Sequence, residues 1–156
     1  MSIHYHVVSN WFIEKSKQEN IEITPRRLQK LVYLAHAWSL GVTRKPLISE
    51  KFEAWKYGPV LRKLYKFYRS VGNNPIQKSH RKYKTDIIDN DSHLKSLLEF
   101  IWLRYSQLDT EELFAMTSND SGPWAVTLRN YSETQSEYIP NILLEEYYHK
   151  LYRIIY

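Results

Sequence analysis

One stretch of the sequence decides the fold, and it reads TPRRLQKLVYLAHAWSL over residues 24–40. Thr24 offers a hydroxyl group that can cap a helix, and Pro25 follows at the first helical position, where its missing N–H group costs nothing. Apolar residues then recur at intervals of three and four, as on a helix with one buried face. They are Leu28, Leu31, Val32, Ala35 and Trp38. The stretch therefore predicts a long amphipathic helix, which Gly41 is predicted to end.

Further helices are predicted downstream of this stretch. Residues 94–105 repeat their apolar positions at three and four, and Asp109 and Glu112 have the spacing of a capping box. Two later apolar stretches begin at proline, a residue that suits the first turn of a helix. The chain has no internal repeat and no long linker. We therefore expect residues 1–156 to form one domain, a mainly α, single compact multi-helix domain.

The segment that follows the long helix is less regular. Over residues 52–57 the side chains alternate in character, which indicates a short strand. The basic connector over residues 78–88 is the candidate partner of this strand in a short β-hairpin. Gly58-Pro59 is predicted to begin the third helix, because proline is favoured in the first helical turn.

Catalytic and metal sites lack the residues that they need in this sequence. The chain has no cysteine, which excludes disulfides, thiolate zinc sites and cysteine nucleophiles. Its four glycines are not clustered as a phosphate-binding loop requires. Of its six histidines, His4 and His6 are two residues apart and diverge on a helix, and the other four have no second histidine at a helical or hairpin spacing. Adjacent acids such as Glu111 and Glu112 diverge by about 100° on a helix. We expect no enzyme, no cofactor and no metal.

The overall composition is that of a soluble domain. Of the 156 residues, 43% are apolar and 25% are charged. No apolar stretch approaches the ~20 residues that span a bilayer, and the first residues lack the basic and apolar parts of a secretion signal. We therefore expect a cytoplasmic protein with no membrane partner.

The charge is unevenly distributed along the chain. The net charge of +5 combines +2 over residues 1–43, +10 over 44–84 and −7 over 85–156. Within residues 62–84, basic and aromatic side chains are interleaved. Such a segment can follow a nucleic-acid backbone, so a basic nucleic-acid-binding protein or a nuclease is the alternative function. A charge run is more often a solvated face, and no recognition helix is evident, so nucleic acid is not the expected partner.

Four blocks of the sequence resemble the Panacea domain of SocA-like and GepA-like antitoxins. They lie within residues 24–38, 46–65, 113–124 and 139–148. The Trp-Lys-Tyr-Gly-Pro run over residues 55–59 is the most specific of the matching features. One departure is Ser118, which stands where the family often has a histidine. No role of that histidine is therefore carried over to this chain.

The resemblance implies an antitoxin of a bacterial or phage toxin–antitoxin pair, which binds and neutralises a cognate protein toxin encoded by a neighbouring gene. The residues expected on the binding surface are basic or aromatic: Arg26, Arg27, Lys30, Trp55, Lys56, Tyr57, Arg62, Lys63 and Lys66. The residues expected to fix the structure of the matching blocks are Trp38, Gly58, Pro59, Pro123 and Trp124. Two questions stay open at this point: whether the toxin is blocked or delivered to a protease, and whether the chain forms a homo-oligomer.

Overall fold

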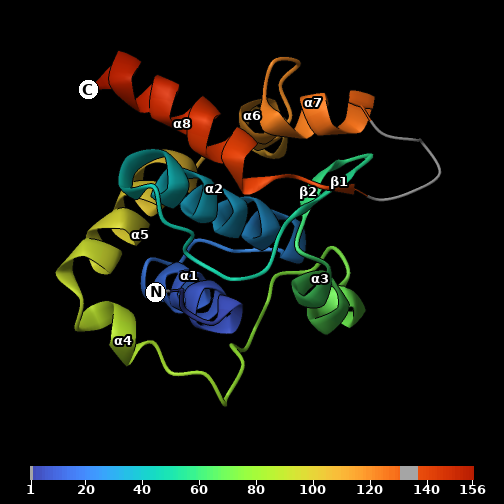
Figure 1. The fold of residues 1–156 in the computed structure, drawn as a ribbon. Helices are drawn as coiled ribbons and strands as arrows, with labels where there is room; N and C mark the ends of the chain where they lie inside the picture. The colour runs from blue at the N-terminus through green and yellow to red at the C-terminus, as the bar shows by residue number, and fades with distance from the viewer. Residues whose placement is uncertain (1, 131–136) are drawn as a thin grey trace.

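Helix α2 (Pro25–Thr43) forms the centre of the fold. In the computed structural model, which describes residues 2–130 and 137–156, it lies between α8 (Asn141–Ile155) on one side and α1 (Tyr5–Gln18) on the other (Figure 1). The other described elements are β1 (Glu53–Trp55), β2 (Gly58–Val60), α3 (Arg62–Tyr68), the 3-10 helix η1 (Arg69–Val71), α4 (Asp86–Asp89), α5 (Ser92–Tyr105), α6 (Thr110–Thr117), α7 (Pro123–Asn130) and β3 (Glu137–Tyr138). The predicted fold class, a compact and mainly helical domain, is confirmed.

Two of the helices begin at the predicted caps. The hydroxyl group of Thr24 accepts a hydrogen bond from the N–H group of Arg27 at 3.3 Å, at the start of α2. At the start of α6, the Asp109 carboxylate accepts from the Glu112 N–H group at 2.8 Å, and the Glu112 carboxylate accepts from the Asp109 N–H group at 3.1 Å. Both ends of this capping box are therefore formed.

The small sheet contains the predicted strand, but the predicted hairpin partner is wrong. Strand β1 pairs antiparallel with β2 on one side and with β3 on the other. Residues 78–84 form no strand, and α4 begins soon after them. The physical reason is the turn between β1 and β2: Gly58 has a φ of +122°, which lets the chain reverse at once. The strand therefore pairs with its immediate neighbour in sequence.

The same turn corrects the predicted start of the third helix. Gly58 and Pro59 belong to β2, and α3 begins at Arg62. Strand β2 lies at the edge of the sheet, and an edge strand tolerates a proline because one side of it needs no N–H donor. The Gly-Pro pair therefore returns the chain towards α2 before the helix starts.

Gly41 does not end α2, contrary to the prediction. The helix continues to Thr43, and Arg44 ends it with a φ of +63°. At Gly41, α8 crosses α2 so closely that a Cβ atom would lie 2.6 Å from the backbone carbon of Tyr148. His149 also donates its ring Nδ1–H to the Gly41 carbonyl oxygen at 3.0 Å. The glycine is needed for close helix packing.

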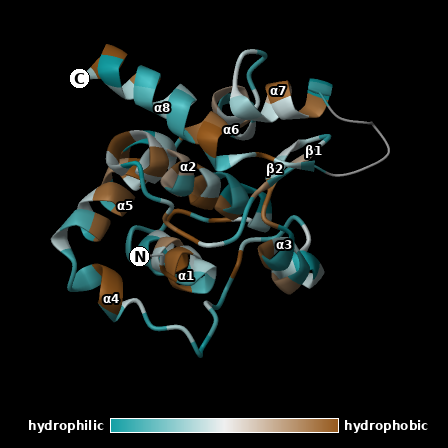
Figure 2. Cartoon of the chain, in the orientation of Figure 1, coloured by the Kyte–Doolittle hydropathy of each residue, from teal (hydrophilic) through white to brown (hydrophobic). Residues whose placement is uncertain are grey.

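Burial divides α2 into two parts. Its predicted apolar stripe from Leu28 to Trp38 is fully buried, and the Trp38 indole N–H donates to the Tyr105 hydroxyl at 2.9 Å. Figure 2 shows that the helix begins with hydrophilic residues beside β2 and continues with hydrophobic ones. The polar beginning of α2 therefore meets the sheet and α3.

Within the part of the chain that the structure describes, no helix has both the length and the apolar character to cross a membrane.

A candidate partner-binding cavity beside α2

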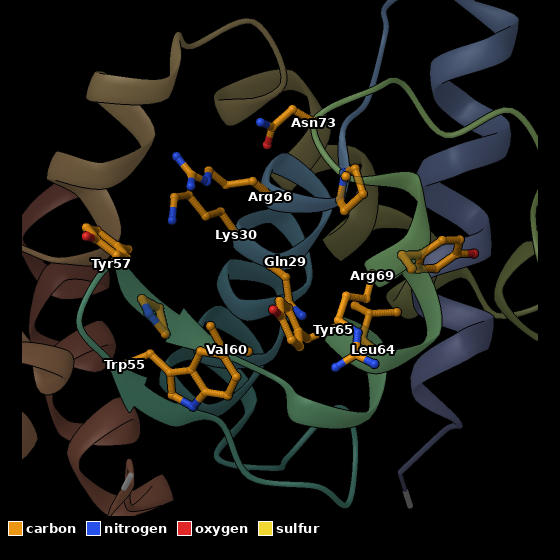
Figure 3. Close-up of a pocket in the computed structure, with 14 residues that line it drawn as sticks. Arg26, Gln29, Lys30, Trp55, Tyr57, Val60, Leu64, Tyr65, Arg69 and Asn73 are labelled. Atoms are coloured by element: carbon orange, nitrogen blue, oxygen red, sulfur yellow. The ribbon is translucent and has the colours of Figure 1, made fainter. Parts of the chain in front are cut away.

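A cavity of about 400 Å³ lies between the beginning of α2, the β1–β2 hairpin and α3 (Figure 3). Its lining comes from segments far apart in the sequence and is largely aromatic, apolar and basic. The lining residues are Pro25, Arg26, Gln29, Lys30, Trp55, Tyr57, Pro59, Val60, Leu64, Tyr65, Tyr68, Arg69, Gly72 and Asn73. The volume falls within the range of about 300–1,000 Å³ that is usual for ligand pockets.

Helical spacing explains which side chains of α2 reach this cavity. Arg26 and Lys30 are four residues apart and therefore share a face of the helix. Arg27 is rotated by about 100° from Arg26 and points elsewhere. It donates two hydrogen bonds, to the carbonyl oxygens of Ser106 at 2.8 Å and Leu108 at 2.6 Å. Arg27 therefore ties α2 to the end of α5.

Lys30 is the most unusual residue of the cavity. Its side chain is only 4% exposed, and its Nζ lies 5.9 Å from the centre of the Phe114 ring. Burial, assisted by the positive charge of Arg26, lowers the pKa of Lys30 to about 8. Within residues 2–130 and 137–156, no carboxylate pairs with its ammonium group. A buried cation thus lies at the cavity without a compensating charge from the described part of the chain.

Gln29 fastens the hairpin to α2. Its side-chain amide donates to the carbonyl oxygen of Leu61 at 3.0 Å and accepts from the N–H group of Leu61 at 2.9 Å. This pair of hydrogen bonds imitates a strand pairing at the junction between β2 and α3. Gln29 therefore fixes the distance between two walls of the cavity.

Trp55 is held in place by three neighbours. Its indole N–H donates to Glu53 at 3.2 Å, and the ring edge contacts Tyr65 at 5.1 Å between ring centres. Arg62 donates to both carboxylate oxygens of Glu53 at 2.9 Å and lies 5.3 Å from the Trp55 ring centre. A bidentate pair of this kind has a defined geometry. The indole is thus fixed beside the cavity.

Two of the expected structural residues, Gly58 and Trp124, lie in or contact the same hairpin. The Trp124 indole N–H donates to the Trp55 carbonyl oxygen at 2.7 Å and so connects α7 to β1. A Cβ atom on Gly58 would lie 3.1 Å from the Lys30 Nζ and 3.2 Å from the Ser118 Oγ. Ser118, the departure from the family pattern in the third block, is therefore next to the hairpin.

The structure brings some of the predicted binding residues together and separates others. Arg26, Lys30, Trp55 and Tyr57 line one cavity. The remaining predicted binding residues lie outside its lining: Arg27, Lys56, Arg62, Lys63 and Lys66. Sequence reasoning did not identify several lining residues: Gln29, Tyr65, Tyr68, Arg69 and Asn73. For Gln29 a signal was present, since it lies three residues after Arg26 on the same helix.

The chemistry that this cavity offers is binding of an anion. Arg26, Lys30 and Arg69 are basic, and none of the described residues that line the cavity is acidic. The beginning of α2 also faces the cavity, and the first turn of a helix carries a partial positive charge. In the described residues, no group of three or more histidine or acidic side chains is placed to hold a metal ion.

Comparison with known proteins gives the family. The sequence profile described as "Antitoxin SocA-like, Panacea domain" matches residues 28–125, which include Lys30, the hairpin and Trp124. Antitoxin SocA of Caulobacter vibrioides (strain NA1000 / CB15N) is 30% identical over 134 residues, covering 80% of this chain and 70% of that protein. No solved structure matches the chain. As the four sequence blocks predicted, the chain belongs to the family of SocA-like antitoxins with a Panacea domain.

Proposed function

We propose that this chain is an antitoxin that neutralises a cognate protein toxin by direct binding, with the cavity beside α2 at the centre of the contact surface. One observation carries the proposal: Arg26, Lys30, Trp55 and Tyr57, which come from two separate blocks of the family pattern, line a single cavity. The toxin is encoded by a neighbouring gene, and both proteins act in the cytoplasm. Neutralisation requires no bond to be made or broken by the antitoxin.

The character of the cavity favours a polypeptide as the partner. Tyrosine, tryptophan and arginine are the residues that most often dominate protein–protein binding energy. Trp55 is already fixed by Glu53 and Arg62, and an immobilised aromatic side chain loses little conformational freedom on binding. Tyr57 is 68% exposed beside it and offers a large apolar surface with a polar end.

The basic segment 62–84 is less suited to nucleic acid than its sequence indicated. His80 stacks on Phe67 with ring centres 4.7 Å apart, and Tyr83 stacks on His4 at 4.1 Å. These rings are engaged within the protein, whereas binding of single strands needs aromatic rings that are free to stack on bases. The first cation of the segment, Arg62, is neutralised by Glu53. These contacts support the choice of a protein partner.

The test of the proposal is neutralisation in cells followed by binding in vitro. Each adjacent gene is expressed alone and then together with this chain, and growth is measured. We expect one neighbour to arrest growth alone and to be tolerated on co-expression, and the two purified proteins to elute together in size-exclusion chromatography. If no neighbour is toxic, or if toxicity persists beside soluble antitoxin, the proposal is wrong.

The position of the contact surface is tested with two matched tyrosine variants. Tyr57 at the cavity and Tyr156 at the end of the chain are 68% and 70% exposed, so Tyr57→Ala and Tyr156→Ala remove the same side chain at equal exposure. We expect Tyr57→Ala to weaken toxin binding by about 30-fold, the size of a hot-spot residue, and Tyr156→Ala to have no effect. Equal effects of the two variants would place the contact elsewhere.

A further inference from the structure

Lys30 has a position that the fold alone does not explain. A buried cation without a charged partner costs folding free energy, and an apolar side chain of the same length would fill the space without that cost. Ionisable groups whose pKa is strongly perturbed by burial concentrate at functional sites. Lys30 is only 4% exposed, lines the cavity and has no carboxylate partner among residues 2–130 and 137–156, so a partner from another molecule would reach it through the cavity.

The surrounding charges select an anion. Figure 3 shows the Lys30 and Arg26 side chains extending from α2 in the same direction, towards the side where Tyr57 lies. Arg69 adds a third cation to the lining, and none of the lining residues that the structure describes carries a negative charge. An anion within a few ångströms of Lys30 would restore the pKa of the ammonium group towards its ordinary value.

The remaining lining decides which anion fits. Trp55, Val60 and Leu64 present apolar surface, which suits an anion carried on a hydrocarbon stem. Pro25 and Pro59 also line the cavity, and neither has an N–H group to donate. A phosphate cradle depends on several converging backbone N–H groups, so the two prolines disfavour phosphate. A carboxylate needs fewer donors and can pair with a single ammonium group.

We propose that the cavity admits an aspartate or glutamate side chain of the toxin, whose carboxylate forms an ion pair with Lys30 while its aliphatic stem packs against Trp55 and Val60. The proposal rests on the proposed antitoxin function and adds the chemistry of the recognised group. Truncation of one partner of a buried ion pair leaves the other charge without compensation, so this contact discriminates strongly against toxins that lack the acid.

The experiment uses the intact chain and three defined probes. The pKa of the Lys30 ammonium group is measured by NMR in protein with isotope-labelled lysine, in the presence of Ac-Leu-Glu-Leu-NH2, Ac-Leu-Gln-Leu-NH2 or inorganic phosphate. We expect the glutamate peptide to bind saturably, with an affinity of about 1 mM for so short a ligand, and to raise the pKa of Lys30. The glutamine peptide, which has the same shape without the charge, is expected to bind at least about tenfold more weakly.

Three results would overturn the inference: equal binding of the two peptides, a pKa of Lys30 that the glutamate peptide leaves unchanged, or saturable binding of phosphate alone, which would assign the cavity to phosphorylated ligands. None of these depends on a variant that has to fold. The Lys30→Met chain serves as a second check, since it is expected to lose the glutamate peptide, while Lys56→Met, outside the cavity lining, is expected to retain it.

Binding of the toxin separates this inference from the proposed function. If the wild-type chain neutralises a neighbouring toxin and Lys30→Met does so equally well, the carboxylate contact is wrong and the antitoxin function stands. If the wild-type chain neutralises no toxin, the proposed function fails, and the peptide measurements still decide what the cavity binds.

Discussion

The ammonium group of Lys30 lies beside Gly58, against the space that a side chain at position 58 would need. A Cβ atom at position 58 would be 3.1 Å from the Lys30 Nζ, closer than a side chain is normally found. Gly58 also has a φ of +122°, a backbone conformation that residues with a side chain rarely adopt. The glycine of the Trp-Lys-Tyr-Gly-Pro run therefore serves two purposes: it allows the turn of the hairpin, and it leaves space for a buried lysine from α2.

Substitution of Gly58 by alanine is the first prediction. We expect Gly58→Ala to lower the free energy of unfolding by about 2–3 kcal/mol, because backbone strain and the displacement of Lys30 act together. Gly72 is the matched control: its φ is +67°, and nothing lies within 4 Å of an added Cβ atom. Gly72→Ala is expected to cost about 1 kcal/mol from the backbone alone. Urea denaturation measures both, and equal losses would show that the contact with Lys30 has no energetic weight.

Replacement of Lys30 by methionine is expected to stabilise the isolated protein. Methionine has a similar length, carries no charge and can contact the Phe114 ring, which lies 5.9 Å from the present ammonium group. We expect Lys30→Met to raise the free energy of unfolding by about 1–2 kcal/mol at neutral pH while weakening toxin binding. Thermal unfolding of both proteins measures the first effect. A loss of stability would show that the ammonium group has a structural partner.

The difference in unfolding free energy between Lys30→Met and the wild-type chain is expected to depend on pH, because of the lowered pKa of Lys30. The pKa falls to about 8 on folding, so between about pH 8 and the ordinary value near 10.5 the unfolded chain binds more protons than the folded one. The contribution of Lys30 to stability therefore increases as the pH rises through this window. We expect the advantage of Lys30→Met to shrink between pH 8 and 10, measured by urea denaturation in parallel. A constant difference would mean that the lysine titrates normally.

Steering of the toxin by exposed cations is a separate prediction. Lys63 and Lys66 are exposed on α3 outside the cavity lining, whereas Arg62 is bound to Glu53 and is left intact. We expect Lys63→Ala/Lys66→Ala to slow toxin association by about 2- to 5-fold at low salt, with little change in dissociation, because exposed charges act mainly on the encounter. Surface plasmon resonance measures both rates.

A charge-matched control tests whether position matters. Lys17 on α1 and Lys150 on α8 are also exposed, so Lys17→Ala/Lys150→Ala changes the net charge equally. This control is expected to leave the association rate almost unchanged. The slower association of Lys63→Ala/Lys66→Ala is expected to disappear at high salt, where exposed charges are screened. If the two double variants slow association equally, only the net charge matters and α3 has no steering role.

Local signals predicted the helices well because each signal acts within a few residues. Thr24 and Asp109 cap α2 and α6 as their sequences indicate, since a cap needs only its own first turn. Gly41 and Gly58 were misread because a glycine has several uses. Close packing of α8 against α2 requires the first, and the hairpin turn requires the second. The role of Gly41 depends on α8, which is distant in sequence, and the role of Gly58 depends on the turn that its neighbours form.

The cavity could be predicted only in part, because its lining depends on contacts between segments that are distant in sequence. The family blocks identified Lys30, Trp55 and Tyr57, and the structure places them around one space. The expected binding surface also includes Arg27, but hydrogen bonds to the end of α5, more than seventy residues away, hold its guanidinium outside the cavity. Arg69 reaches the cavity only because α3 follows a hairpin whose turn was not foreseen. Long-range pairing of this kind leaves no local pattern.

A cluster of aromatic and histidine rings beside α1 leads to the last prediction. His6 is buried, its Nδ1 has no hydrogen-bond partner in the described structure, and its ring contacts Phe67 at 4.6 Å and His80 at 4.6 Å between ring centres. Burial, followed by the nearby His80 and His4, lowers the pKa of His6 from 6.5 to about 4. The fold therefore favours the neutral ring.

Because the pKa of His6 is lowered on folding, the stability of the fold is expected to decrease at acidic pH. Between about pH 6.5 and pH 4 the unfolded chain binds more protons at position 6 than the folded chain, so stability is complete above this window and is lost as the pH falls through it. We expect the loss to amount to about 3 kcal/mol for His6, since one pKa unit corresponds to about 1.4 kcal/mol. His6→Phe keeps a ring in the cluster and removes the titrating group, so its unfolding free energy should fall less over the same window. Parallel curves for the two proteins would show that acid destabilises the fold elsewhere.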